Sequence, residues 1–447
     1  MSTATIEEVN QKIHELPAPV LDEHATETQL ARVLQSKLPP LKCVGEDWYI
    51  YHEGVWSKTS RDQVKPLALA IQDERTRSAK KAMEVVKHVE YSNQTTGKEF
   101  RSFHYWNAKG EIILNCSNCV LAVSVEKVRI LQHQEEYMFT RKIAASYNLE
   151  ANCSSFYQAL EFALPDSADI NVIRCFSGYV LMPDCRYEVA LICYGDSDTA
   201  KSTISTGIEA ALGPELVTKC SLAQISNPES KNLAKLERAA LNLSTELNAV
   251  EVGSENFKML VSGEAIDADC KYRDSITLCT PCKLWFNTNH LPKFTHGTDA
   301  ELKRLLFIRF AQKVLIRDEQ IKENIKAEGD GVFLFMIEGL RKLMMDKRFP
   351  KASDKSFETK TRFKLQNDPL GSFIEEECVL GGGQEIVKDQ LYDAYSKFGR
   401  GNGVWHHEEG AFFKDLYARH PTLKAIRPRD GAERTQKVKG IDVKDEC

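Results

Sequence analysis

A run of nine residues carries the strongest chemical signal in this chain of 447 residues. It follows an apolar stretch at 187–195 and precedes a stretch of helical character at 202–212. In that context small residues let backbone N–H groups surround phosphate oxygens, a lysine reaches the β and γ phosphates, and a serine ligates Mg²⁺. The run predicts a nucleotide-binding loop, against the simpler interpretation of a chance glycine turn. Its residues are Gly195, Asp196, Ser197, Asp198, Thr199, Ala200, Lys201, Ser202 and Thr203.

The loop departs from the usual pattern in two ways. Ala200 stands where such loops end on a glycine, and its methyl group fits if φ at that residue is negative. Asp196 and Asp198 would repel a polyphosphate unless their side chains point outward.

Two polar residues downstream extend the prediction to hydrolysis. The stretch LERAALNLSTEL places Glu246 at the end of an expected strand, where a carboxylate polarises the attacking water and holds hydrated Mg²⁺. An ordinary solvated glutamate explains the same position. Asn289 ends the apolar stretch KLWFNTN, where it either orients the attacking water or starts a turn before Pro292.

Together these motifs resemble the superfamily 3 helicases, of the primase-helicase type found in phages, plasmids, phage satellites and poxviruses. The resemblance covers the chain from about Trp48 onward. In that family a phosphate loop precedes a strand that ends on glutamate, a lysine with a turn and hairpin, an Asn-His-x-Pro motif, and an arginine. The matching stretches, in the same order, are GDSDTAKST, LNLSTEL, FKMLVSGEAIDADCKYRD, FNTNHLP and ELKRLLFIRF.

The resemblance implies an AAA+-like ATP hydrolase that uses ATP and Mg²⁺. Lys201 then contacts the phosphates, and Asn289 senses the γ-phosphate. Ser202 and Glu246 hold Mg²⁺, and Glu246 also serves hydrolysis. Arg304 matches the arginine finger that reaches the neighbouring subunit's nucleotide, so the expected assembly is a homohexameric ring.

A second arginine and a hairpin complete the family's pattern. Arg309, five residues on and inside an apolar stretch, is the less favoured candidate for the finger, and the simpler interpretation is that it forms a structural ion pair. The hairpin after Lys258 matches the hairpin with which the family binds single-stranded DNA. The resemblance therefore implies DNA contacts by Lys258, Lys271 and Arg273. Asp269 stands at the family's basic position, which weakens that assignment because a phosphate-binding loop should be positively charged.

Three domains are expected. Residues 1–164 resemble the family's α-rich N-terminal collar, 165–350 alternate strands and helices as an α/β ATPase domain, and 364–447 resemble a winged helix. Within the first, 111–125 predicts a β-hairpin. The charged stretch at 351–363 is interpreted as a linker.

The composition indicates the cellular location of the protein and its binding partners. The chain has no basic, apolar leader and no apolar run of membrane length, so a cytoplasmic location without membrane is expected. Thirteen scattered cysteines favour reduced thiols, and the pairs Cys116/Cys119 and Cys279/Cys282 are interpreted as buried thiols rather than zinc ligands. The net charge of −5 conceals a basic segment, because residues 396–440 carry ten basic and five acidic side chains. DNA is therefore expected to meet the C-terminal domain first.

These expectations favour a replicative DNA helicase of a mobile element, acting on single-stranded and forked DNA. No primase signature is found ahead of the collar, so a separate primase is an expected partner. One alternative is a nucleotide-gated origin-binding protein or loader that holds DNA without unwinding it. Another is a protein-remodelling AAA+ ATPase that does not depend on DNA.

Overall fold

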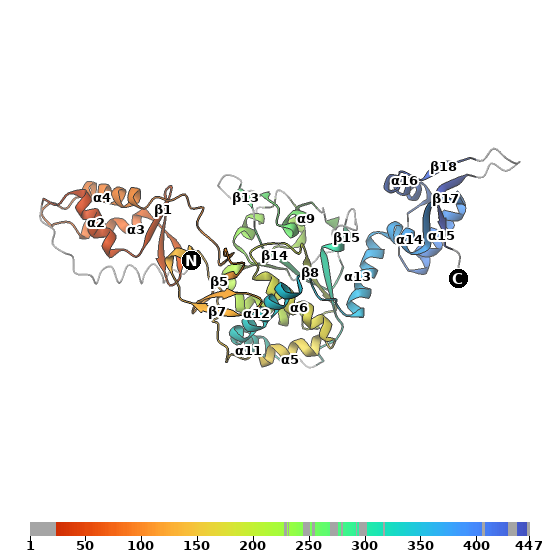
Figure 1. Ribbon diagram of the computed structural model, residues 1–447, viewed down its shortest axis with the longest axis horizontal. Coiled ribbons are helices and arrows are strands. Elements are labelled where there is room, and N and C mark those ends of the chain that lie inside the picture. The colour runs from red at the N-terminus through yellow and green to blue at the C-terminus, as the bar shows by residue number, and fades with distance from the viewer. Residues whose placement is uncertain are drawn as a thin grey trace.

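The computed structural model has three bodies in a row, with the N-terminal unit at the left and the C-terminal unit at the right of Figure 1. Among the residues described, no helix is long and apolar enough to span a bilayer. The structure describes residues 24–227, 230, 232–244, 251–252, 255–268, 276–278, 280–291, 293–294, 302–315, 318–404, 407–427 and 436–444.

The N-terminal body packs three helices on a three-stranded antiparallel sheet. A capping box formed by Thr26 and Gln29 starts its first helix. Its core is separate from the others and contains Leu34, Trp48 and Val85, all fully or almost fully buried. The elements are α2 (Glu27–Lys37), β1 (Leu41–Val44), β2 (Asp47–His52), β3 (Val55–Thr59), α3 (Arg61–Ala70) and α4 (Ala79–Ser92).

A four-stranded antiparallel sheet follows, in the order β4-β5-β6-β7. The hairpin expected at 111–125 is confirmed as β5 and β6, because two apolar runs flank a short polar turn. The strands are β4 (His104–Trp106), β5 (Ile112–Asn115), β6 (Val120–Val123) and β7 (Val128–Leu131).

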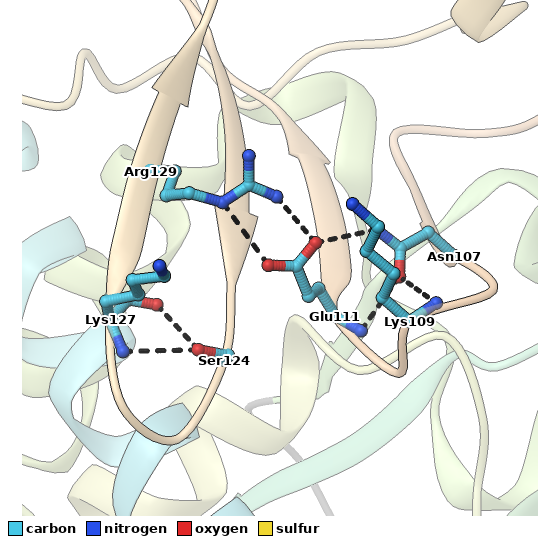
Figure 2. Close-up of polar contacts among 6 residues, drawn as sticks. All are labelled: Asn107, Lys109, Glu111, Ser124, Lys127 and Arg129. Atoms are coloured by element: carbon cyan, nitrogen blue, oxygen red, sulfur yellow. Dashed lines mark hydrogen bonds and ion pairs between the residues drawn. The ribbon is translucent and has the colours of Figure 1, made fainter.

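One buried carboxylate ties the outer strands of this sheet together. Glu111 accepts hydrogen bonds from Arg129 Nη2 at 2.7 Å and Asn107 Nδ2 at 2.8 Å (Figure 2). In the neighbouring turn, the Ser124 hydroxyl accepts from the Lys127 N–H at 3.1 Å. Arg341, from the central body, donates to the carbonyls of the same turn, and so the sheet is fixed against that body.

The first 164 residues differ from the α-rich expectation. Their described part holds seven strands beside four α-helices, because short aromatic and apolar runs pair as hairpins rather than continuing as helices. One face of the four-stranded sheet also shares a core with later helices, since Leu114, Phe156 and Phe176 belong to one buried cluster. The domain bounds at 164, 350 and 364 stay predictions.

The central body confirms the α/β prediction. It is built on a five-stranded sheet in the order β16-β8-β14-β10-β9, with every neighbouring pair parallel. The sheet strands are β8 (Ala190–Gly195), β9 (Val217–Thr218), β10 (Leu241–Ser244), β14 (Lys283–Thr288) and β16 (Leu305–Phe310). Two small pairs lie outside it, formed by β11 (Glu251–Val252), β12 (Ile266–Ala268), β13 (Ile276–Leu278) and β15 (Lys293–Phe294).

Helices cover both faces of this sheet (Figure 1). The helix that contains Gly178 and the helix that contains Leu340 cross in direct backbone contact. A Cβ on Gly178 would lie 2.0 Å from the Leu340 nitrogen, so only glycine fits there. One face carries α5 (Ser154–Ala163), α6 (Ser167–Val180), α7 (Lys201–Leu212), α11 (Ile321–Ala327) and α12 (Gly329–Asp346), and the other carries α8 (Leu222–Ser226) and α9 (Glu255–Ser262).

The stretch at 351–363 is not a linker but most of a helix, α13 (Asp354–Asn367). Its surface is charged almost all round, so the sequence shows little apolar periodicity. The helix is held instead by one ring and by polar contacts: Phe363 packs against Phe307 with ring centroids 4.9 Å apart, and Lys360 Nζ donates to the Leu305 carbonyl at 2.9 Å.

A buried carboxylate joins α13 to the central body. Asp169, on α6, accepts from the Ser353 N–H at 2.9 Å, the Ser353 hydroxyl at 2.7 Å and the Ser356 hydroxyl at 2.9 Å. The Ser356 hydroxyl accepts in turn from the Arg309 N–H of β16 at 2.9 Å. Helix α13 therefore begins in a network that includes the central sheet.

The C-terminal body has the element order expected of a winged helix. Helix, strand, two helices and two strands follow one another, and the sheet order is β17-β19-β18. Leu370, Tyr395 and Phe412 are fully buried in its own core. The elements are α14 (Pro369–Glu377), β17 (Cys378–Val387), α15 (Lys388–Gly401), α16 (Glu409–Arg419), β18 (Lys424–Ile426) and β19 (Lys437–Val443).

Candidate nucleotide site

The predicted loop lies between a strand and a helix, as its sequence context requires. Strand β8 ends at Gly195 and α7 begins at Lys201, so the loop occupies the carboxyl edge of the parallel sheet. Gly195 has no room for a side chain, because a Cβ there would lie 2.1 Å from the Phe310 carbonyl oxygen. Helix α7 directs its N-terminal N–H groups toward the loop, an arrangement that favours anions.

Ala200 does not have the negative φ that the sequence analysis required of it. Its φ angle is +64°, in the left-handed region, and that of Asp198 is +60°. The loop therefore keeps the backbone that glycine usually supplies at its end and carries a strained alanine instead. The side chains of Asp196 and Asp198 are exposed, as phosphate binding requires.

Lys201 is folded back over the loop. Its Nζ donates to the carbonyls of Gly195 at 2.7 Å and Asp196 at 2.6 Å, and to the Thr199 hydroxyl at 3.0 Å. The residue is only 8% exposed, and burial lowers the pKa of its ammonium, with a further lowering from Arg309 nearby. The ammonium is thus held at the loop by acceptors that an incoming phosphate can replace.

Strand β14 brings two asparagines to the same edge. Asn289, just after the strand, donates from Nδ2 to the Ser197 hydroxyl at 3.2 Å and is exposed. Asn287 is buried; it accepts from Trp285 Nε1 and donates to the Ser205 hydroxyl, both at 2.9 Å. Of the two, Asn289 has the position that a contact with a bound phosphate requires.

A cleft of about 1060 Å³ opens above the loop. Two large apolar side chains in its lining stay exposed: Phe162 at the end of α5 is 48% exposed, and Leu315 is 92% exposed. The segment with Leu315 is held over the loop, because the Val314 N–H donates to the Asp198 carbonyl at 2.8 Å. Large apolar side chains that stay exposed in a cleft favour an apolar or aromatic ligand.

Lys322 is a site residue that sequence reasoning missed. It lies on α11, lines the cleft, and donates from Nζ to the Ser202 hydroxyl at 3.3 Å. A second ammonium therefore stands beside the hydroxyl expected to ligate Mg²⁺. Nothing in the local sequence signals this, since 120 residues separate the two.

Arg304 lies at the amino ends of the sheet strands, whereas the loop lies at their carboxyl ends. It precedes β16, and its carbonyl accepts from the N–H of Ala190 at the start of β8. The guanidinium donates to Glu188 Oε2 at 3.0 Å and the Ser262 hydroxyl at 3.3 Å. Arg304 is thus separated from its own loop by the length of β8, about 20 Å at roughly 3.3 Å per residue.

Arg309 does not form the ion pair expected of it with any residue in the described part of the chain. It lies opposite Tyr194 at the carboxyl end of β16, with its guanidinium 4.5 Å from the centre of that ring. Its Nη1 is buried and has no hydrogen-bond acceptor. The aromatic face substitutes for a carboxylate here.

Three predicted residues lie outside the described residues: Glu246, Lys271 and Arg273. The strands on either side of Lys271 and Arg273 are described, and they pair as expected: β12 and β13 are antiparallel neighbours. Lys258 lies on α9, which leads into that hairpin. The structure thus brings together Lys201, Ser202 and Asn289, and it leaves Lys258 and Arg304 elsewhere.

The described residues contain no cluster of three or more histidine, cysteine or acidic side chains that would hold a metal. Cys116 and Cys119 are buried on either side of the β5–β6 turn, and Cys282 is buried as well, in agreement with structural thiols. Cys279 lies outside the described residues.

Comparison with known proteins gives one partial family match and a likeness in fold. Residues 193–304, which run from the phosphate-loop strand to Arg304, match DUF5906, a family of unknown function. Three solved structures of the NrS-1 C-terminal region superpose with TM-scores of 0.54, 0.53 and 0.51, each at 9% sequence identity. They cover 93–94% of this chain and 100% of their own. At that identity the likeness shows the fold.

The strain at Ala200 gives a testable prediction. Ala200→Gly removes the Cβ that disfavours a φ of +64° and should raise the free energy of unfolding by up to about 1 kcal/mol, since glycine's own entropy cost offsets part of the relief. Chemical denaturation measures this. The matched change Ala210→Gly, inside α7, should lower stability by about 1 kcal/mol. Equal destabilisation by both substitutions would contradict a strained Ala200.

Proposed function

We propose that this chain is an ATP-dependent DNA helicase that works as a ring on single-stranded and forked DNA. One observation supports it above the others: Lys201, Asn289 and Phe162, from three distant parts of the sequence, line one cleft at the carboxyl edge of a parallel sheet. Ligands of open α/β sheets bind at that edge. The likeness of the whole chain to the NrS-1 C-terminal region supports a fold shared with it.

In this proposal the cleft orients ATP at both ends. The loop N–H groups bind the phosphates, and Lys201 exchanges the carbonyls of Gly195 and Asp196 for phosphate oxygens. The base lies against Phe162. Asn289 holds the attacking water at the γ-phosphate. No base-reading contact is needed for this arrangement, because stacking accepts every base.

Three positively charged groups neutralise charge on the phosphates. Mg²⁺, when bound, stabilises the charge that develops during phosphoryl transfer, and the Ser202 hydroxyl, with Glu246, would hold it. Lys322 adds a positive charge next to Ser202 from the other side of the cleft. Together with Lys201 it places the phosphates between two ammonium groups.

A second candidate is a nucleotide-gated loader that holds DNA without unwinding it. Two departures from the family's pattern favour it: Ala200 ends the phosphate loop in place of glycine, and Asp269 stands at the hairpin's basic position. DNA-stimulated ATP hydrolysis measured beside strand displacement on forked DNA separates the two. Hydrolysis without displacement supports the loader, and hydrolysis indifferent to DNA supports a protein-remodelling ATPase.

The first prediction concerns Lys201. Lys201→Ala should abolish ATP hydrolysis, because it removes the ammonium at the loop, while the far-ultraviolet circular dichroism stays native. The control Lys342→Ala removes an exposed lysine that pairs with Asp346 on α12 and should leave activity unchanged. Wild-type turnover in the Lys201→Ala protein would overturn the site.

The second prediction concerns Phe162. Phe162→Ala should weaken ATP binding about tenfold, since a stacked base contributes roughly 1–3 kcal/mol, and should leave the affinity for inorganic tripolyphosphate unchanged. Calorimetric titration measures both. Phe357, which is 66% exposed on α13, supplies the control Phe357→Ala. A parallel loss of tripolyphosphate binding would show that Phe162 supports the loop rather than the base.

The third prediction tests Arg304 across subunits. Arg304→Ala should abolish hydrolysis in the assembled protein, and mixing it with Lys201→Ala subunits should restore roughly a quarter of the sites, because some interfaces then join an intact loop to an intact arginine. Lys303→Ala is the neighbouring control and should remain active. No recovery on mixing would count against an arginine that acts in trans.

A further inference from the structure

The winged-helix body distributes its charge in an unexpected way. In a DNA-bound winged helix, the helix before the last two strands usually enters the major groove with its N-terminal residues. Here that helix is α16, and it starts at Glu408 and Glu409, both exposed. Lys414 is its one exposed lysine. Two carboxylates at the leading end would meet the phosphates first and repel them.

The remaining cation of α16 is engaged in ion pairs with the protein's own carboxylates. Arg419 donates from Nη1 to Asp368 at 2.6 Å and from Nε to Asp415 at 3.0 Å. Asp368 is buried and also accepts from the Gly371 N–H at the start of α14. Withdrawing Arg419 toward DNA would leave a buried carboxylate without its cation, which is costly.

The sheet beside α16 has the opposite character. Lys424 on β18 lies directly opposite Lys439 on β19, and both are exposed. Neither forms an ion pair with any residue that the structure describes. Like charges opposite each other in an antiparallel pair destabilise the sheet. A bound polyanion would turn this unfavourable pair into a favourable contact.

One further cation extends the surface. Lys437 is on β19, two residues before Lys439, so the two side chains lie on the same face of the strand. Glu385 of β17 is an acidic side chain beside them; it lies opposite Lys439 and 3.9 Å from Lys437 Nζ. We call Lys424, Lys437 and Lys439 the wing face.

We propose that the wing face, and not α16, binds the phosphate backbone of duplex DNA; this rests on the proposed action on DNA. The other described side chains paired into this face are Val387 and Ile426, so its described part offers no aromatic ring on which an unpaired base would stack. Lysines contact phosphates as point charges, and contacts to phosphates carry no sequence information. The winged-helix body therefore holds the duplex ahead of the motor without sequence preference.

The experiment uses the full chain and a fluorescent blunt duplex of mixed sequence. Lys424→Ala/Lys439→Ala should weaken duplex binding about tenfold, and the slope of log affinity against log salt should fall by about 2, one for each lost phosphate contact. Lys355→Ala/Lys414→Ala removes the same charge from α13 and α16 and should change neither quantity. Binding to oligo-dT should be the same in all three proteins.

The outcomes separate the proposals. If the control pair weakens duplex binding as much as the wing pair, α16 or bulk charge binds DNA, and the wing face is wrong. If the wing pair leaves duplex binding intact, the wing face is wrong as well. The melting temperature of the wing variant should not fall, because a like-charge pair has been removed. If the wild-type protein does not hydrolyse ATP but its duplex binding still depends on Lys424 and Lys439, the proposed helicase is wrong and the wing face is supported.

Discussion

The contact between Gly195 and the Phe310 carbonyl is the constraint on which the site depends. With no side chain at Gly195, β16 passes directly beside the end of β8, and the chain after Phe310 is carried across the phosphate loop. The Val314 N–H can then reach Asp198, and α11 can bring Lys322 to Ser202. A side chain at Gly195 would push β16 away and open the cleft along one wall.

The charges of the site are arranged for exchange rather than for permanent pairing. Lys201 is satisfied by neutral acceptors of its own loop, not by a carboxylate, so a phosphate competes with carbonyls and not with a full negative charge. Arg309 follows the same principle, because an aromatic face holds it. Carboxylates that would compete with phosphate, Asp196 and Asp198, stay exposed. Positive charge near the loop thus remains available to a ligand.

Local sequence patterns predicted what short-range chemistry decides. The strand, loop and helix around Lys201 and the hairpin at 111–125 were found where apolar runs and turn residues placed them. What depends on distant contacts was missed: α13 has a charged surface and is held by Phe307 and Asp169, and Lys322 reaches Ser202 only through the fold. The negative φ expected at Ala200 was wrong for a third reason: the loop imposes a left-handed backbone at this position, whatever residue occupies it.

The Asp169 network also sets the mechanics of the chain. Helix α13 starts on a carboxylate of α6 and a hydroxyl shared with β16, so it moves with the central sheet as a stiff extension. At its other end Asp368 caps α14 and pairs with Arg419 of α16, which fixes α14 to the rest of the C-terminal body. An ion pair between Lys364 and Glu375 also joins α13 to α14. A rotation of the central strands would then swing the C-terminal body as a lever.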